Sequence, residues 1–189
     1  MNGGITDPMG KYVKEIMIDR QEIDQMCRRL GAQISADYEG REVVLIGVLK
    51  GAFIFMADLA RYITIPCRID FMSVSSYGSG TRTSGVVRIN KDLDSDITGR
   101  HVIVIEDIVD TGLTLNHLKQ LLGTRNPASI ALCTAFDKPD RRKIEIEVDY
   151  VGMKIRDEFI VGYGLDFDGR YRNLPDVAIL GDDAAGGDK

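Results

Sequence analysis

A run of β-branched residues that ends in acids constrains the fold of this chain more than any other feature. Residues 102–105, Val-Ile-Val-Ile, are all apolar, as expected for a strand that is covered on both faces of a sheet. Glu106 and Asp107 follow this run directly, and a third acid, Asp110, comes three residues later. Residues 111–114, Thr-Gly-Leu-Thr, then form a turn. We therefore expect a buried strand to end in carboxylates and a turn.

The residues after this turn have the spacing of a helix. Leucines recur at i, i+3 and i+7, at Leu115, Leu118 and Leu122. The free amides in the first turn of a helix carry partial positive charge and bind phosphate. Gly112 lets the backbone approach a ligand, and the hydroxyls of Thr111 and Thr114 add donors. A Thr-Gly pair could instead only cap the helix. The spaced acids and buried strand favour a phosphate site, because ligands bind outside the carboxyl ends of strands in open α/β sheets.

Apolar runs and helical stripes alternate along the rest of the chain. Asp19 and Glu22 have the spacing of a capping box, which predicts a helix that ends near Gly40. A further helix is expected over residues 53–62. Strands are expected at residues 43–48, 69–74, 86–89, 102–105, 129–135, 149–153 and 159–163. This order predicts an α/β fold with a parallel, doubly wound sheet. The glycine motifs of Rossmann dehydrogenases, Walker A kinases and α/β-hydrolases are missing.

Composition narrows the class of protein further. A length of 189 residues favours one domain over residues 1–189, and we expect its polar ends, residues 1–11 and 182–189, to be flexible. The net charge of -5 argues against nucleic acid as a partner, and no apolar run approaches the length of a membrane span. Three widely spaced cysteines and the lack of a signal peptide predict reduced thiols in a cytoplasmic protein.

Four separated segments resemble the type I phosphoribosyltransferases, and among these the bacterial hypoxanthine-guanine phosphoribosyltransferase family. They are residues 47–52 (Gly-Val-Leu-Lys-Gly-Ala), 76–78 (Ser-Tyr-Gly), 106–114 and 159–166 (Phe-Ile-Val-Gly-Tyr-Gly-Leu-Asp). The resemblance implies that family's fold, a central, mostly parallel sheet flanked by helices with a small hood region. It also implies a homodimer or homotetramer.

The reaction that the resemblance implies belongs to purine salvage. The enzyme would transfer 5-phosphoribose from phosphoribosyl pyrophosphate to hypoxanthine or guanine, giving IMP or GMP and pyrophosphate. Loss of pyrophosphate leaves a cation-like sugar carbon, so such a site needs oxygen anions, Mg²⁺ and exclusion of water.

Roles in binding phosphoribosyl pyrophosphate follow from the matched motifs. Glu106 and Asp107 resemble the acids that contact the ribose hydroxyls and Mg²⁺, and Asp166 resembles a further metal carboxylate. Asp110 would be the catalytic residue, holding a proton at purine N7. The remaining contacts to phosphoribosyl pyrophosphate would come from Lys50, Gly51, Thr111, Gly112, Leu113, Thr114 and Arg172. The resemblance also implies a non-proline cis bond between Leu49 and Lys50.

Roles in binding the base follow from two other segments. Lys138 resembles the lysine that reads the purine 6-oxo group, whereas an isolated loop lysine is more often only solvated. Phe159 resembles the aromatic residue that stacks on the base, although a lone phenylalanine is more often part of the core. Ile160 would offer its backbone, and Asp166 would also lie at the base. Ser76 and Tyr77 resemble a lid over the reacting centre.

Other functions on the same fold agree less well with the sequence. A non-catalytic regulator of transcription would need a basic face, which an acidic chain does not favour, and attenuators lack an acid at the position of Asp110. A transferase for orotate, adenine or uracil conflicts with Lys138 and with the motif at residues 159–166. A xanthine-preferring relative is the closest alternative.

Overall fold

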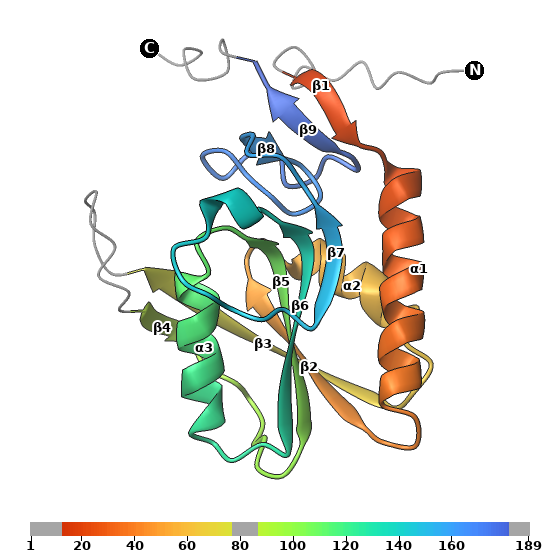
Figure 1. The fold of residues 1–189 in the computed structure, drawn as a ribbon, viewed down its shortest axis with the longest axis vertical. Coiled ribbons are helices and arrows are strands. Elements are labelled where there is room, and N and C mark those ends of the chain that lie inside the picture. Colours follow the sequence, from red (N-terminus) through yellow and green to blue (C-terminus); the bar gives the residue numbers. More distant parts are fainter. Residues whose placement is uncertain (1–12, 77–86, 182–189) are drawn as a thin grey trace.

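A six-stranded sheet forms the centre of the molecule. The computed structural model describes residues 13–76 and 87–181 (Figure 1). The strands run from edge to edge in the order β4 (Val87–Lys91), β3 (Cys67–Ser76), β2 (Val43–Leu49), β5 (His101–Val109), β6 (Ser129–Asp137) and β7 (Tyr150–Lys154). Every pairing is parallel except that of β4 with β3. The mostly parallel sheet of the expected fold is therefore confirmed.

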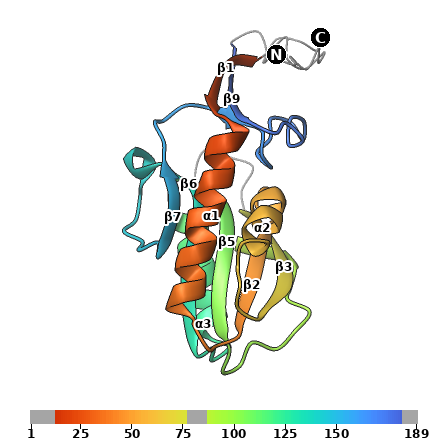
Figure 2. The same cartoon turned by 90° about the vertical axis from the view of Figure 1, so that its right-hand side faces the viewer.

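Helices cover both faces of this sheet. Helices α1 (Arg20–Asp37) and α2 (Phe53–Ala60) share one apolar core with residues such as Leu45 and Ile103. Helix α3 (Leu113–Gly123) packs on the other face, where Leu115, Leu118 and Leu122 join a second core. Figure 2 shows α1 and α2 together on one side of the strands. The central strands are buried on both faces, which explains their continuous apolar sequences.

A three-stranded sheet stands beyond the carboxyl end of the central strands (Figure 1). It consists of β1 (Val13–Ile18), β9 (Val177–Leu180) and β8 (Ile160–Val161), all antiparallel. We call it the hood. It brings the two ends of the described chain together and places the segment after β8 above the ends of β2 and β5. The pattern of the sequence predicted neither β1 nor β9.

The start of α1 agrees with the sequence-based prediction, whereas the end of β5 differs from it. The capping box is confirmed, because Asp19 Oδ1 accepts hydrogen bonds from the amides of Gln21 and Glu22, while Glu22 Oε2 accepts one from the amide of Asp19. The end of the central strand was predicted too early. β5 continues to Val109, because β6 is long enough to pair with it there. Glu106 and Asp107 therefore lie within β5, and Asp110 follows its last residue directly.

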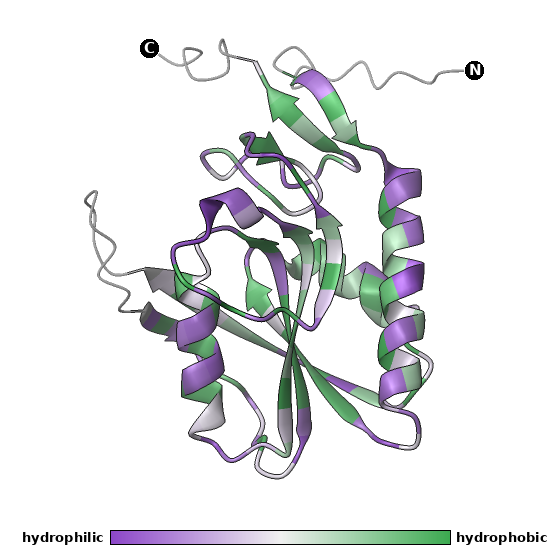
Figure 3. Cartoon of the chain, in the orientation of Figure 1, coloured by the Kyte–Doolittle hydropathy of each residue, from purple (hydrophilic) through white to green (hydrophobic). Residues whose placement is uncertain are grey.

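The distribution of hydropathy agrees with this packing. Figure 3 shows apolar residues along the central strands and polar residues on the outer faces of the helices. Within the described part of the chain, no helix is long and apolar enough to cross a membrane. The end segments that we expected to be flexible, and Tyr77 of the expected lid, lie outside the described residues.

Candidate active site

Asp107, one of two adjacent acids on β5, faces the loop that follows β2. Asp107 Oδ1 accepts a hydrogen bond from the amide of Ile108 at 2.8 Å. A β-carbon at position 51 would lie 1.5 Å from Asp107 Oδ2, so only glycine allows this approach. Glu106 Oε2 is buried and has no hydrogen-bond partner among the described residues. A buried carboxylate oxygen without a partner is costly. These two acids are therefore suited to hold a ligand with hydroxyl donors or a cation.

Burial disfavours the charged forms of both acids. It raises the pKa of Asp107 to about 6, and Asp166 adds to this while Arg172 opposes it. Burial, followed by the negative charge of Asp107, raises the pKa of Glu106 well above its ordinary value. Each acid is more easily ionised once a cation lies beside it. Acids of this kind cluster at functional sites.

Oxygen ligands of this type fit a hard cation such as Mg²⁺, which prefers carboxylates together with waters or substrate oxygens. Among residues 13–76 and 87–181, no three His, Cys, Asp or Glu side chains are grouped so that they alone could hold a metal. A metal at Glu106 and Asp107 would therefore need oxygen atoms from the substrate as well. The buried oxygen of Glu106 is the observation that favours such a ligand.

The turn after β5 forms a small cavity at the start of α3. Gly112 is the N-cap and has a φ of 81°, in the left-handed region that favours glycine. Thr111 Oγ1 accepts a hydrogen bond from the amide of Leu113 at 3.4 Å. The cavity has a volume of about 120 Å³ and is lined by Glu106, Ile108, Val109, Asp110, Thr111, Gly112, Thr114 and Leu115. Its size and its amides suit a phosphate group.

A larger cavity of about 600 Å³ lies on the other side of Asp110. Its lining combines the end of β5, the loop after β6 and the segment that leads into the hood, at Asp107, Ile108, Asp110, Lys138, Arg141, Asp157, Glu158, Phe159, Ile160, Leu165 and Asp166. Asp110 borders both cavities. A ligand that fills both cavities would therefore have an anionic end in the smaller cavity. Its other end would be bound by the groups that line the larger cavity.

Lys138 and Phe159 both contribute to this larger cavity. Lys138 Nζ donates a hydrogen bond to the carbonyl oxygen of Glu158 at 2.5 Å and lies 3.6 Å from Asp157 Oδ1. Its side chain is only 11% exposed, so it is not an ordinary solvated loop lysine. Phe159 is 58% exposed and meets the ring of Phe167 edge-on, so it does not belong to the core. Both common alternatives for these residues are therefore excluded.

Asp110 is held by an arginine rather than by the helix. Its Oδ1 accepts a hydrogen bond from Arg141 Nε at 3.0 Å, and its backbone carbonyl accepts one from Arg142 Nη1 at 2.7 Å. Helix α3 has no side-chain cap among its hydrogen bonds. The alternative in which Asp110 only caps the helix is therefore contradicted by the geometry.

The remaining expected residues converge from the hood and from β2. Arg172 Nη2 lies 2.5 Å from Asp166 Oδ1, and Arg172 Nη1 donates to the carbonyl oxygen of Gly164 at 2.6 Å. The peptide bond between Leu49 and Lys50 is cis, as the resemblance implied. Gly51, the residue after this Lys50, contacts Asp107.

The comparison with known families decides the class of protein. A model of the phosphoribosyl transferase domain matches residues 16–168. This chain belongs to the phosphoribosyltransferase family.

Several of the phosphoribosyltransferases that it resembles come from bacteria. The hypoxanthine phosphoribosyltransferase of Salmonella typhimurium is 50% identical over 169 residues, which cover 88% of this chain and 95% of that protein. The hypoxanthine-guanine phosphoribosyltransferase of Streptococcus pneumoniae is 46% identical over 168 residues, covering 89% of this chain and 93% of that protein. A crystal structure of a hypoxanthine phosphoribosyltransferase from Staphylococcus aureus superposes with a TM-score of 0.93 at 46% identity, covering 95% of this chain and 98% of that one. The resemblance inferred from four motifs is confirmed.

The candidate active site of this phosphoribosyltransferase also contains two residues that were not predicted from the sequence, Arg141 and Asp157. Arg141 pairs with Asp110 and lies 3.5 Å from Asp157 Oδ2, and Asp157 in turn lies beside Lys138. These charged residues lie in loops without periodicity, so only the surrounding motifs could have drawn attention to them. Ser76 is the last residue of β3, and the lid role of Ser76 and Tyr77 stays a prediction.

Proposed function

We propose that this phosphoribosyltransferase transfers 5-phosphoribose from phosphoribosyl pyrophosphate to a 6-oxopurine, hypoxanthine or guanine. The products would be IMP or GMP and pyrophosphate, which is a reaction of purine salvage. The observation that carries the proposal is the buried ammonium group of Lys138 in the larger cavity. A protonated lysine donates only, so it matches the carbonyl at purine C6 and not an amino group.

Other groups of the cavity support a purine as the ligand. The exposed ring of Phe159 offers an apolar face on which a flat base can stack. Ile160 and the carbonyl of Glu158 lie nearby in the same lining and offer backbone atoms to the base edge. Asp110, between the two cavities, would accept the proton at purine N7 or hold it there as the new bond forms at N9.

The phosphate groups of the substrate would bind at backbone amides and basic side chains. The turn Thr111–Thr114, through its amides and hydroxyls, would hold the 5-phosphate in the smaller cavity. Lys50, Gly51 and Arg172 would hold the pyrophosphate, and Leu113 would contribute its amide only. Arg172 is already oriented by Asp166 and by the carbonyl of Gly164.

Mg²⁺ is the cation that we propose for this site. Glu106 and Asp107 would hold it together with the ribose hydroxyls, and Asp166 is a further carboxylate near the pyrophosphate. When bound, the ion neutralises the charge that develops on the departing pyrophosphate. Asp107 and Glu106 would stabilise the positive charge that develops on the sugar carbon, because a cation beside them favours the ionised form of each carboxyl group.

We further propose that the chain acts as one domain, in a homodimer or homotetramer, in the cytoplasm. A related structure from Trypanosoma cruzi was solved in a study of oligomeric state, at a TM-score of 0.88 and 39% identity. Cys27, Cys67 and Cys133 are free, and Cys27 and Cys133 are buried. Unpaired thiols are typical of a reducing compartment.

A panel of bases tests the proposed substrate class. Consumption of phosphoribosyl pyrophosphate would be measured with hypoxanthine, guanine, xanthine, adenine and orotate, each supplied separately. We expect hypoxanthine or guanine to give the fastest reaction and adenine and orotate to give none. A preference for xanthine, adenine or orotate would overturn the proposed specificity, while the family would stand.

A further inference from the structure

A tyrosine outside both cavities holds a strained turn beside the proposed site. Gly162, Tyr163 and Gly164 have φ angles of 91°, 51° and 98°, so three consecutive residues lie in the left-handed region. Glycine is required at position 164, because a β-carbon there would lie 2.1 Å from the carbonyl oxygen of Gly51. A tyrosine in this region is disfavoured, and it persists only where its surroundings hold it.

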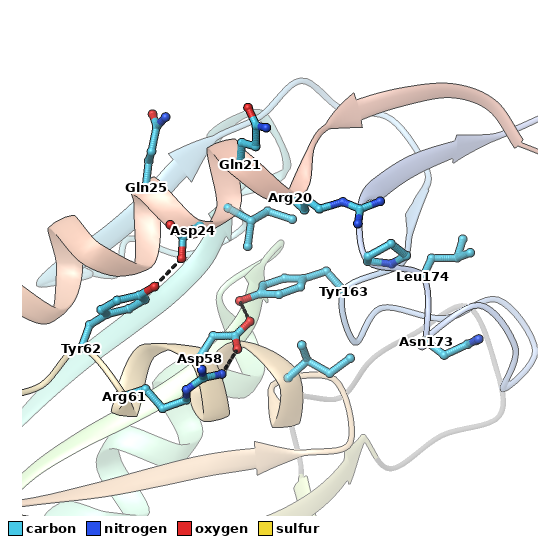
Figure 4. A pocket seen from close by; sticks show the side chains of 13 residues that line it. Arg20, Gln21, Asp24, Gln25, Asp58, Arg61, Tyr62, Tyr163, Asn173 and Leu174 are labelled. Carbon is cyan, nitrogen blue, oxygen red and sulfur yellow. Dashed lines mark hydrogen bonds and ion pairs between the residues drawn. The ribbon is translucent and has the colours of Figure 1, made fainter. Parts of the chain in front are cut away.

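The side chain of Tyr163 supplies the contacts that hold the turn. Its ring is 3% exposed and packs edge-on against Phe136 of β6, with ring centroids 6.4 Å apart. Its hydroxyl donates a hydrogen bond to Asp58 Oδ2 on α2 at 3.1 Å (Figure 4). The thiol of Cys27 on α1 lies 3.4 Å from the same hydroxyl. Burial raises the pKa of Cys27 to about 11, so the thiol keeps its proton and can donate to the tyrosine.

The Tyr163–Asp58 hydrogen bond joins two segments that carry proposed ligand contacts. Asp58 lies on α2, whose N-cap, Ala52, directly follows Lys50 and Gly51. Tyr163 precedes Gly164, which touches Gly51 and accepts the hydrogen bond from Arg172. A movement of Tyr163 relative to α2 would therefore displace the pyrophosphate loop relative to Arg172.

The cavity that surrounds this hydrogen bond has its charges paired internally. It has a volume of about 710 Å³ and lies between α1, α2 and the segment that connects β8 to β9 (Figure 4). Asp58 pairs with Arg61 at 3.6 Å as well as with Tyr163, and Arg20 lies 3.7 Å from Asp176. A second tyrosine in this cavity, Tyr62, donates to Asp24 of α1. The charged groups here balance each other, and the hydrogen bonds of both tyrosines join separate elements.

We propose that Tyr163 is a positioning residue that, through its hydrogen bond to Asp58, sets the pyrophosphate loop at residues 50–51 against Arg172 and Asp166. The inference rests on the proposed function, because it assigns the two segments to one substrate. Tyr163 itself touches no substrate. Its loss would leave the chemistry of the acids intact and would misplace the leaving group.

The test compares Tyr163→Phe with Tyr62→Phe. Each variant removes one hydroxyl that donates to an aspartate in the same cavity, but only Tyr163 adjoins the turn at Gly164. Because small misplacements of reacting groups are costly, we expect Tyr163→Phe to lower turnover about 10-fold and to raise the Michaelis constant for phosphoribosyl pyrophosphate, with that for hypoxanthine nearly unchanged. Tyr62→Phe should keep wild-type kinetics. Equal kinetics in the two variants would overturn the inference.

Hydrogen exchange provides a measurement that needs no activity. Amides of the peptide covering residues 48–53 should exchange roughly 5-fold faster in Tyr163→Phe than in wild type, and at the wild-type rate in Tyr62→Phe. Unchanged exchange in Tyr163→Phe would refute the positioning role even if the protein transferred no phosphoribose. If exchange changed as expected but wild type used no 6-oxopurine, the proposed function alone would fail. Tyr163→Phe and Asp58→Ala each remove the same hydrogen bond. The turnover of the double variant should therefore be no lower than that of the slower single variant.

Discussion

Gly51 and Asp107 approach each other so closely that a β-carbon on Gly51 would lie 1.5 Å from the carboxylate oxygen Oδ2 of Asp107. Gly51 belongs to the loop after β2, and Asp107 belongs to the neighbouring strand, β5. The contact brings the proposed pyrophosphate loop against the proposed metal-binding acid. Any side chain at position 51 must therefore displace one of the two.

The first prediction is that Gly51→Ala inactivates the enzyme while leaving it folded. The added methyl group would move Asp107 or the loop, and a displacement of about 1 Å at a reacting centre costs on the order of 10²-fold in rate. Gly123→Ala is the matched control, because a β-carbon on Gly123 has no atom within 4 Å. The control should keep its activity and gain roughly 0.5–1 kcal/mol in free energy of unfolding. Wild-type turnover in Gly51→Ala would contradict the assigned contact.

The second prediction concerns the pH dependence of stability. Burial raises the pKa of Asp107 from 3.8 to about 6. Between these values the folded protein holds a proton that the unfolded chain has lost, so the stability contributed by this carboxyl falls as pH rises from about 4 to 6. Asp107→Asn removes the titration and keeps an oxygen for the amide of Ile108.

The melting temperature of Asp107→Asn minus that of wild type should therefore increase between pH 4 and pH 7. The increase corresponds to on the order of 2 kcal/mol in the free energy of unfolding. Catalysis should be lost in the same variant. The exposed acid Glu145 provides a control, since Glu145→Gln should show no such pH-dependent difference. A constant or narrowing difference for Asp107→Asn would mean that its carboxyl is not destabilised by burial.

The third prediction concerns recognition of the base. Lys138→Gln replaces a charged donor with a neutral one, and loss of a charge-assisted hydrogen bond should lower kcat/KM for hypoxanthine and guanine roughly 10–100-fold. Binding of phosphoribosyl pyrophosphate should change little. Lys143 is an exposed lysine of the same loop, so Lys143→Gln serves as the control. If both variants matched wild type with hypoxanthine, Lys138 would have no role in base recognition.

The fourth prediction concerns proton transfer at the base. Asp110→Asn keeps an oxygen that can accept from Arg141 but cannot take a proton, so turnover should fall by roughly 10²–10⁴-fold. The melting temperature should be nearly unchanged, because Asp110 does not cap α3. Asp140→Asn, at an exposed position in the following 3₁₀ turn Pro139–Arg141, should be kinetically normal. Nearly normal turnover in Asp110→Asn would remove it from the mechanism.

Much of the fold was accessible from the sequence because its central elements have local signatures. The apolar run before Glu106 and the leucines of α3 each follow one clear period, and the capping box marks the start of α1. The hood had no such signature. β1 pairs with β9 across most of the chain, with register shifts, and a local pattern does not reveal a partner that distant.

Some residues of the site could be predicted from the local sequence, whereas others could be assigned only by resemblance to a family. The acids of β5 could be argued from their place at the end of a buried strand, whereas Lys138, Phe159 and Asp166 were assigned by resemblance. The pairing of Arg141 with Asp110 and the hydrogen bond between Tyr163 and Asp58 were missed. Both depend on loop conformations, including positive φ angles in the turn at residues 162–164, that the sequence pattern does not encode.

The most direct test of the central claim is to identify the products. The purified chain would be incubated with hypoxanthine, phosphoribosyl pyrophosphate and Mg²⁺, and IMP and pyrophosphate would be quantified by mass spectrometry and by a phosphate assay after pyrophosphatase. We predict that the two products appear in equal amounts, and that both disappear in excess chelator because pyrophosphate leaves poorly without charge neutralisation. Failure to form IMP, or undiminished formation of IMP in excess chelator, would contradict the account.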